Sequence, residues 1–383
     1  MTLFSQNDNA QPGHAPTPSG RRARWRTRGV VLVSLAALFA LAFTAIPVPF
    51  ALEQPGPWWN TLGNQSVFED CSPNPTEEGT EPLIEISGTK TYPTSGALDL
   101  LTVCLQGTPE YMPNWFDVIQ AYLSPSQSVI PFEYVYPKDQ TQEERDESNA
   151  AEMVDSQGES VAAAMTYLGY TLETTAVVVS TSAGMPADGV LLPDDIVIAL
   201  NDVPVSSIDE LRSALQDAGS LNPADITVIR DGATLVTTLT PVSDDGTTLI
   251  GLVGQTEYKY PFEVTISLND VGGPSAGMMF ALGIVDKVTP GEMTGGKNFA
   301  GTGTIDAAGN VGPIGGIRQK LYSALGAQAP YFLAPLGNCD EIVGNVPQGL
   351  QVFAVATMTE AVTAVSTVAS GNDAAISALP TCR

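Results

Sequence analysis

The chain opens with one long apolar run and continues as short segments in which apolar and polar residues alternate. Residues 30–50 are apolar except for Ser34, Thr44 and two prolines. As a helix rising 1.5 Å per residue, residues 30–52 would reach about 34 Å, enough to cross a hydrocarbon core of about 30 Å. The pattern therefore predicts one transmembrane helix over 29–52. A cleaved signal peptide is the alternative, because Ala40-Leu41-Ala42 has the form of a cleavage site.

The segments that follow predict a mixed α/β protein. Four prolines punctuate residues 53–80, which we interpret as a linker. Residues 83–87 alternate between apolar and polar side chains, and together with residues 98–105 they predict two strands of a hairpin. A short helix is expected over 115–123. A long helix is expected from Thr141, where Glu144 completes a capping box, to its end at Gly169.

The middle of the chain predicts a separate, mainly-β module over 169–245. Strands are expected over 176–180 and 194–201, then a helix over 208–218 capped by Ser207. A hairpin follows, with strands 226–230 and 234–239 around the turn dipeptide Asp231-Gly232. This order resembles a PDZ domain, although Asp194 stands where the family usually has glycine.

A PDZ domain captures an extended peptide as an added strand and holds its carboxylate on the backbone amides of a loop. Leu168-Gly169-Tyr170 has the apolar-Gly-apolar form of that loop and precedes the first strand of the module. The alternative is that Gly169 only ends the preceding helix.

The charge of the chain is unevenly distributed. There are 16 Lys and Arg residues against 42 Asp and Glu residues, a formal charge of −26. Five arginines and one acid lie in 1–28, which leaves −30 on the remainder. Such a surface repels nucleic acid, so we expect no nucleic-acid partner. Arginines before the apolar run predict a cytoplasmic tail over 1–28 and an extracytoplasmic remainder, in a single-pass protein of the cell membrane.

All four cysteines follow the apolar run: Cys71, Cys104, Cys339 and Cys382. An even number in an oxidising compartment predicts two disulfides. Pairing Cys71 with Cys104 and Cys339 with Cys382 is the most local of three possible pairings, and four buried free thiols are the alternative. Because there is no C-x-x-C spacing and no histidine cluster, we expect no metal site and no cofactor.

Candidate nucleophile chemistry lies in Gly272-Gly273-Pro274-Ser275-Ala276-Gly277, between a predicted strand (264–268) and a predicted helix (276–285). Gly273, Pro274, Ala276 and Gly277 belong to this nucleophile loop, and the unpaired N–H groups at the start of the helix would lie near a developing oxyanion. The only histidine is His14, so a Ser-His-Asp triad is excluded from the body of the protein. The alternative is a plain turn in which Ser275 caps the helix.

Lys320 is the best candidate for the base. It follows Pro313-Ile314-Gly315-Gly316 on a predicted helix, among Ile317, Leu321, Tyr322 and Leu325. Burial among such neighbours lowers the pKa of an amine, which can then take the proton of a serine. An ordinary helix lysine that extends its amine to solvent is the alternative.

These motifs together resemble the proteolytic domain of the Lon family over residues 262–337. The resemblance rests on the G-P-S-A-G loop, the P-I-G-G before the lysine helix, their spacing of 45 residues, and Thr302-Gly303. It implies that Ser275 is the nucleophile, that Lys320 is the general base and that Thr302 positions the lysine. Gly272, Thr304 and Arg318 depart from the family pattern and leave substrate preference and level of activity open.

The resemblance also implies the domain organisation. The expected fold is an α/β (α+β) Lon-type proteolytic domain with a PDZ domain, preceded by the transmembrane helix. Residues 81–168 resemble the first part of the proteolytic domain and 246–383 its main part, so the PDZ domain would be an insertion between them. Lon-like proteolytic domains commonly form rings, so a homo-oligomer is compatible with the resemblance.

The resulting hypothesis is a membrane-anchored, extracytoplasmic serine endopeptidase that acts on unfolded or extended protein segments recognised by its PDZ domain. It would be independent of ATP, because no G-x-x-x-x-G-K-[ST] motif occurs in the sequence. Two alternatives stay open: a catalytically silent PDZ scaffold at the membrane, and a protein whose serine cuts its own chain once.

Overall fold

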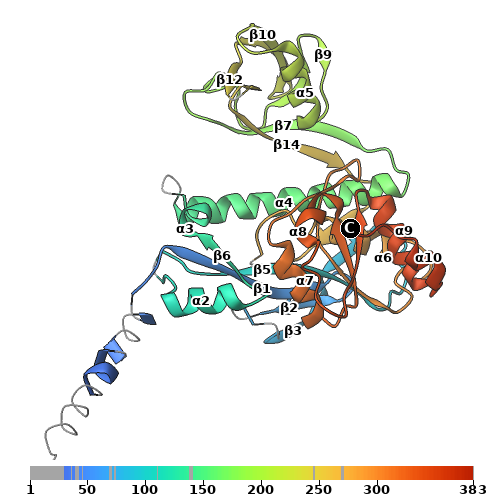
Figure 1. Cartoon of the computed structure of the whole chain (residues 1–383). Helices are drawn as coiled ribbons and strands as arrows, with labels where there is room; N and C mark the ends of the chain where they lie inside the picture. The colour runs from blue at the N-terminus through green and yellow to red at the C-terminus, as the bar shows by residue number, and fades with distance from the viewer. Residues whose placement is uncertain are drawn as a thin grey trace, which may run out of the picture.

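In the computed structural model, the residues described are 30–35, 37–38, 43–44, 46–68, 71–72, 75–109, 111–137, 141–244, 246–268 and 271–382. They form a mixed α/β body and a smaller β-rich module that stands apart from it (Figure 1). Each part has a six-stranded sheet.

The sheet of the body has the strand order β20-β19-β16-β5-β1-β6. Its first four strands run parallel: β20 (Gln351–Val355), β19 (Tyr331–Pro335), β16 (Asn298–Gly301) and β5 (Ala97–Gln106). The strands β1 (Phe50–Asn60) and β6 (Ser128–Pro131) complete it in antiparallel pairs. Parallel pairing requires crossover connections, which the helices of the body supply.

Helices cover both faces of this sheet. On one face a single core joins β5 to α4 (Gln142–Tyr167), α6 (Gly277–Val288) and α9 (Met358–Ala369). On the other face, α7 (Ile317–Gly326) and the short α8 (Cys339–Ile342) enclose a second core. α6 is buried along almost its whole length, so it lies inside the core and not on its surface.

Smaller elements complete the body. They are β2 (Asn64–Val67), β3 (Glu77–Pro82), β4 (Ile84–Ser87), α2 (Trp115–Leu123), α3 (Phe132–Val135), β15 (Glu263–Ile266), β17 (Thr304–Ile305), β18 (Val311–Gly312), the 3-10 helix η1 (Leu336–Asn338) and α10 (Asp373–Ser377). The predicted helices at 115–123 and 141–168 are confirmed within a residue or two.

Residues 53–80 are not a linker. They contain most of β1, which lies inside the body sheet, and the antiparallel pair β2 and β3. The prolines of β1 belong to a bulge, since the register with β5 shifts between Pro55 and Trp58. A bulge tolerates proline because the ladder is already interrupted there.

The predicted hairpin of 83–87 and 98–105 is also wrong. β4 pairs with β15, with Ile84 opposite Ile266, whereas β5 pairs with β1 and β16. The body is therefore built from two stretches of chain that lie on either side of the module. This is the arrangement expected for an inserted domain.

The module contains β7 (Glu173–Thr181), β8 (Ile196–Leu200), β9 (Val203–Pro204), α5 (Ile208–Ala218), β10 (Ala224–Arg230), β11 (Ala233–Leu239), β12 (Val242–Asp244), β13 (Thr247–Leu249) and β14 (Leu252–Lys259). The hairpin around Asp231-Gly232 is confirmed, with Arg230 opposite Ala233. The module extends beyond residue 245, because β14 pairs with β7 along its length. These two strands carry the chain out of the body and back (Figure 1).

The predicted transmembrane helix over 29–52 is not found in this form. Residues 46–49 contain a bend and a bridge, and β1 begins at Phe50. Within the described ranges, no helix has the length and apolar character that a membrane span requires. Helical residues occur at 30–35, 37–38 and 43–44, and the other residues between 29 and 45 lie outside the described ones.

Candidate active site

Hydrogen bonds with α4 hold the loop before α6 in place. The N–H of Gly273, whose φ is +86°, donates to the backbone oxygen of Asn149 at 3.1 Å. The hydroxyl of Ser156 donates to the backbone oxygen of Pro274 at 2.9 Å. Both donors therefore fix the segment immediately before Ser275.

Ser275 does not cap the helix that follows. The N-cap of α6 is Ala276, and no side chain caps that end. The N–H groups of Ser275 and Ala276 find no backbone acceptor among the described residues. The serine hydroxyl is therefore available to other partners. The two amides beside it lie at a helix N-terminus, where oxyanions are stabilised.

Lys320 reaches Ser275 from the opposite face of the sheet. Its amine lies 2.7 Å from Ser275 Oγ and 3.0 Å from Thr302 Oγ1. The lysine is only 2% exposed, so its amine does not extend into solvent. Burial lowers the pKa of Lys320 from 10.5 to about 7.

Thr302 links the lysine to the serine loop. Its hydroxyl donates to the backbone oxygen of Ser275 at 2.9 Å and accepts from the amine of Lys320. The N–H of Gly303 donates to the same Ser275 oxygen at 2.9 Å. The three side chains predicted from the sequence, Ser275, Lys320 and Thr302, are therefore brought into direct contact.

A cleft of about 520 Å³ lies over the serine and the lysine. One wall is strand β5 from Leu100 to Leu105, and Ser267, Leu268 and Val271 also line the cleft. Met153 of α4 and Trp59 of β1 also line it. No sequence motif predicts the β5 wall, because its position depends on pairing with β1 and β16.

The β5 wall presents an open strand edge. β16 pairs with β5 only from Ala97 to Leu100, whereas β1 follows its other edge to Gln106. Beyond Leu100, no described strand pairs with the β16 side of β5. Residues 101–105 thus offer backbone groups to the cleft, as an edge strand does.

Leu168, Gly169 and Tyr170 form the end of α4 and not a peptide-binding loop. The N–H of Gly169 donates to Thr166 and that of Tyr170 donates to Met165, both at 3.0 Å, and Gly169 has φ +87°. This is the Schellman motif that ends many helices. Since the N–H of Leu168 donates to Ala164, all three amides are used within the helix end.

The two disulfides pair the cysteines locally. Cys71 pairs with Cys104, and Cys339 pairs with Cys382, with Cα–Cα distances of 5.7 and 4.9 Å. Cys104 lies on β5 and lines the cleft, so the first disulfide connects the segment after β2 to the cleft wall.

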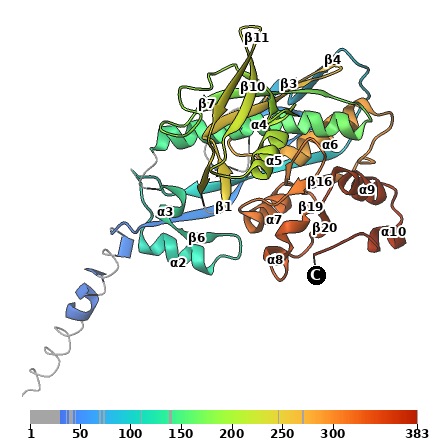
Figure 2. The ribbon, with the colours of Figure 1, turned by 90° about the horizontal axis from the view of Figure 1, so that it is seen from above.

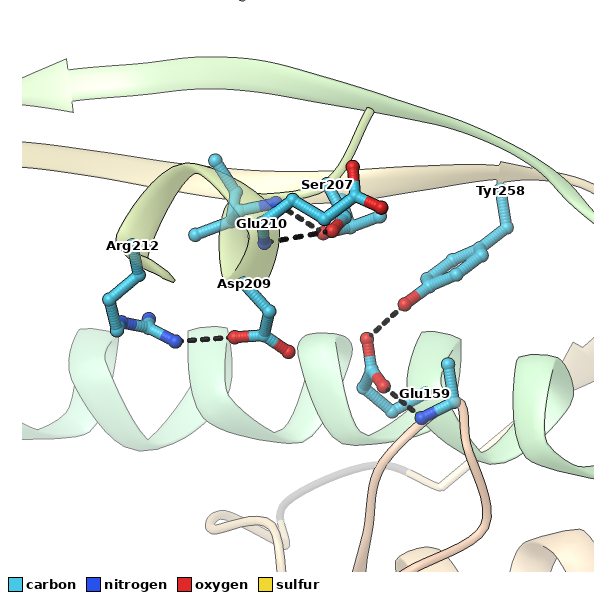
Figure 3. Close-up of polar contacts among 9 residues, drawn as sticks. Glu159, Ser207, Asp209, Glu210, Arg212 and Tyr258 are labelled. Atoms are coloured by element: carbon cyan, nitrogen blue, oxygen red, sulfur yellow. Dashed lines mark hydrogen bonds and ion pairs between the residues drawn. The ribbon is translucent and has the colours of Figure 1, made fainter. Parts of the chain in front are cut away.

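The module meets the body at Glu159 of α4. Its carboxylate accepts from the hydroxyl of Tyr258 on β14 at 2.5 Å and from the N–H of Ala307 at 2.6 Å (Figure 3). Burial raises the pKa of Glu159, and the nearby carboxylates of Asp155 and Asp209 raise it further, although the two hydrogen bonds oppose this. Asp209 belongs to α5 of the module, which lies over α4 (Figures 2 and 3).

Comparisons with known proteins concern mainly the last part of the chain. Residues 269–369 match the family model of the Lon protease (S16) C-terminal proteolytic domain. The Lon protease of Azospirillum brasilense is 38% identical over 89 residues, which cover 22% of this chain and 11% of that protein. The Lon protease of Rhizobium meliloti is 36% identical over 93 residues, again 11% of that protein. The match therefore spans about a tenth of the length of these relatives.

Among solved structures, the PDZ domain of the SdrC-like protein from Listeria innocua matches with a TM-score of 0.20 and 17% identity, covering 21% of this chain and 92% of that one. The corresponding domain from Listeria monocytogenes gives the same score and identity. The part of the chain that contains Ser275, Thr302 and Lys320 is thus similar to the proteolytic domain of Lon proteases.

Proposed function

We propose that this chain is a serine endopeptidase in which Ser275 is the nucleophile and Lys320 the general base. The observation that carries the proposal is the contact of 2.7 Å between a hydroxyl and a buried amine whose pKa is about 7. Near neutral pH such an amine is neutral in about half of the molecules, so its lone pair can accept a proton. The similarity to Lon proteolytic domains supports the same reaction class.

The steps follow from the geometry. The amine of Lys320 takes the proton of Ser275 as the serine oxygen attacks the peptide carbonyl carbon. The N–H groups of Ser275 and Ala276 stabilise the resulting oxyanion. The Lys320 ammonium then gives its proton to the leaving amine, and an ester to Ser275 remains. Water attacks this ester, with Lys320 again as base, and releases the second product.

Thr302 positions the amine for this transfer. A lysine has a flexible stem, and Thr302 Oγ1 holds the amine at 3.0 Å while it also donates to the serine loop. Among the described residues, burial is the only cause of the lowered pKa of Lys320. A dry site therefore keeps the base neutral without another charged group.

The proposed substrate is an extended polypeptide. The open edge of β5 over residues 101–105 would pair with it as an added strand, which places backbone carbonyls beside Ser275. The module, with the order of elements of a PDZ domain, would select extended segments by the same mode, on the outer edges of its terminal strands β11 and β14. Residues 168–170 take no part in this capture, because their amides are used at the end of α4.

Attachment to a membrane by residues 30–46, with the body outside the cytoplasm, is also part of the proposal. It is supported by the apolar run, by the five arginines before it and by two disulfides, which persist in oxidising compartments. Independence of ATP is proposed on the lack of a phosphate-binding loop motif in this sequence.

The test compares four forms of the full chain on an unfolded protein, with mass spectrometry of released peptides. These are the wild type, Ser275→Ala, Lys320→Ala and the control Ser267→Ala, whose hydroxyl lines the same cleft without contacting the lysine. We expect cleavage by the wild type and the control only. No cleavage by the folded wild type would refute the protease and favour a scaffold, and cuts confined to its own chain would indicate self-processing.

A further inference from the structure

Helix α2 has its large apolar side chains on the outside. Five of its nine residues are between 41% and 83% exposed, and all are aromatic or aliphatic: Trp115, Phe116, Ile119, Tyr122 and Leu123. Its inner face is formed by the smaller Val118 and Ala121, which pack on Val48 and Leu52. The helix is therefore anchored by its small residues and presents its large ones, the reverse of a surface helix in water.

This outer face carries no charge. Asp117 is the only residue of α2 that is charged at neutral pH, and its carboxylate accepts from the N–H of Asn114 in a capping box. No lysine or arginine lies on the helix. A partner that covers this face must accordingly be apolar, and its affinity cannot come from ionic attraction.

The face adjoins the point where the apolar N-terminal segment leaves the body. Pro47 forms a bridge to Asn114, and the N–H of Val48 donates to the backbone oxygen of Pro113 at 2.9 Å. The ring of Phe43 lies 6.3 Å from that of Trp115. In Figure 1 the N-terminal segment accordingly leaves the body next to α2.

The length of that segment limits how far the body can stand from a bilayer. Residues 30–46 number 17 and would reach about 25 Å as a helix, against a hydrocarbon core of about 30 Å. No linker follows, because β1 starts at Phe50. A chain anchored through this segment would therefore hold α2 at the membrane surface, where tryptophan and tyrosine side chains are favoured.

We propose that the outer face of α2 (Trp115, Phe116, Ile119, Tyr122 and Leu123) inserts into the interfacial layer of the bilayer that holds residues 30–46. The inference rests on the membrane attachment proposed above and is independent of proteolysis. Because the face is uncharged and the remainder of the chain carries −30, insertion requires apolar contact and does not require anionic lipid. Zwitterionic phosphatidylcholine is thus the appropriate probe.

The experiment uses the full chain in phosphatidylcholine vesicles whose acyl chains carry bromine, a contact quencher of tryptophan. The quenching of Trp115 is measured as the difference in quenched tryptophan fluorescence between the wild type and the Trp115→Phe variant. We expect a clear difference that 0.5 M salt leaves unchanged. The variant Phe116→Gln/Ile119→Gln/Leu123→Gln should lose at least half of it. The control Leu235→Gln/Val236→Gln alters two exposed apolar residues of β11 in the module and should keep it.

Flotation of the same vesicles separates the two proposals. If the protein floats but the Trp115→Phe variant is quenched as strongly as the wild type, α2 is not in the lipid and this inference is overturned. A second copy of the chain or a polypeptide would then be the partner that covers the face. If the protein does not float, the attachment itself is refuted. Flotation together with Trp115 quenching supports both.

Discussion

Replacing Lys320 with methionine should stabilise the protein near neutral pH while removing the proposed base. Burial lowers the pKa of Lys320 to about 7, whereas a lysine in an unfolded chain keeps a pKa of about 10.4. Between these values the unfolded state binds a proton that the folded state does not. The free energy of unfolding therefore falls as the pH decreases from about 10 to about 7, and below 7 it loses nothing more to this group.

The size of the effect follows from the two pKa values. A difference of roughly three units, at 1.36 kcal/mol per unit, costs the wild type about 4 kcal/mol at pH 7. Methionine has a similar volume and carries no charge to desolvate, but it gives up the hydrogen bonds to Ser275 and Thr302. At about 1 kcal/mol for each bond, the net gain in stability is about 2 kcal/mol at pH 7.

The assay is urea unfolding of the full chain with its disulfides intact, between pH 6.5 and 9.5. The advantage of Lys320→Met over the wild type should be largest at pH 7 and below, and it should shrink by roughly 1.4 kcal/mol for each pH unit above 7. Lys90→Met, which removes an exposed lysine, serves as the control and should show no such trend. A variant that is no more stable at pH 7, or equally more stable at every pH, would refute the desolvated lysine.

Three further predictions concern the surroundings of the dyad. Thr302→Val should lower kcat at least tenfold and change the pH profile of kcat, whereas Thr302→Ser should restore both. Steady-state kinetics across pH 6–9 would check this, and a change in KM alone would contradict a positioning role. Gly316→Ala should lower Tm by several degrees, because φ is +67° and an added Cβ would lie 2.4 Å from a side-chain carbon of β5. The control Gly315→Ala, whose added Cβ would have nothing within 4 Å, should not lower Tm, and equal Tm values for the two variants would count against the geometry. Replacing Cys339 and Cys382 with serine should cost about 3–4 kcal/mol in urea unfolding, because their disulfide closes a loop of 43 residues; unfolding midpoints that match the wild type would contradict it.

The chemistry of the site was predictable because it depends on local motifs. Ser275 lies in a glycine-rich turn before a helix, and Lys320 lies on a helix among apolar neighbours, so residue type and local pattern sufficed. Thr302 followed from the family resemblance. The contacts of Asn149 and Ser156 with the serine loop carry no such pattern, since they join residues more than 100 positions apart.

The strand pairing was not predictable for related physical reasons. Pro55 and Pro57 made residues 53–60 look like a linker, yet they lie at a bulge where the missing N–H groups cost little. Residues 83–87 have the alternation of a strand, but alternation does not identify the partner. That partner, β15, is separated from β4 by the whole module.

The position of the module has a consequence for the order of folding. β4 is synthesised long before β15, and the body cannot complete until the chain between them has been made. Once the module folds, Glu173 and Lys259 are paired neighbours, so the open loop between β4 and β15 is about halved and its closure costs about 0.6 kcal/mol less. Early folding of the module therefore prepares the pairing of β4 with β15. Substitutions that destabilise the module should reduce the yield of folded protein even though they lie far from Ser275.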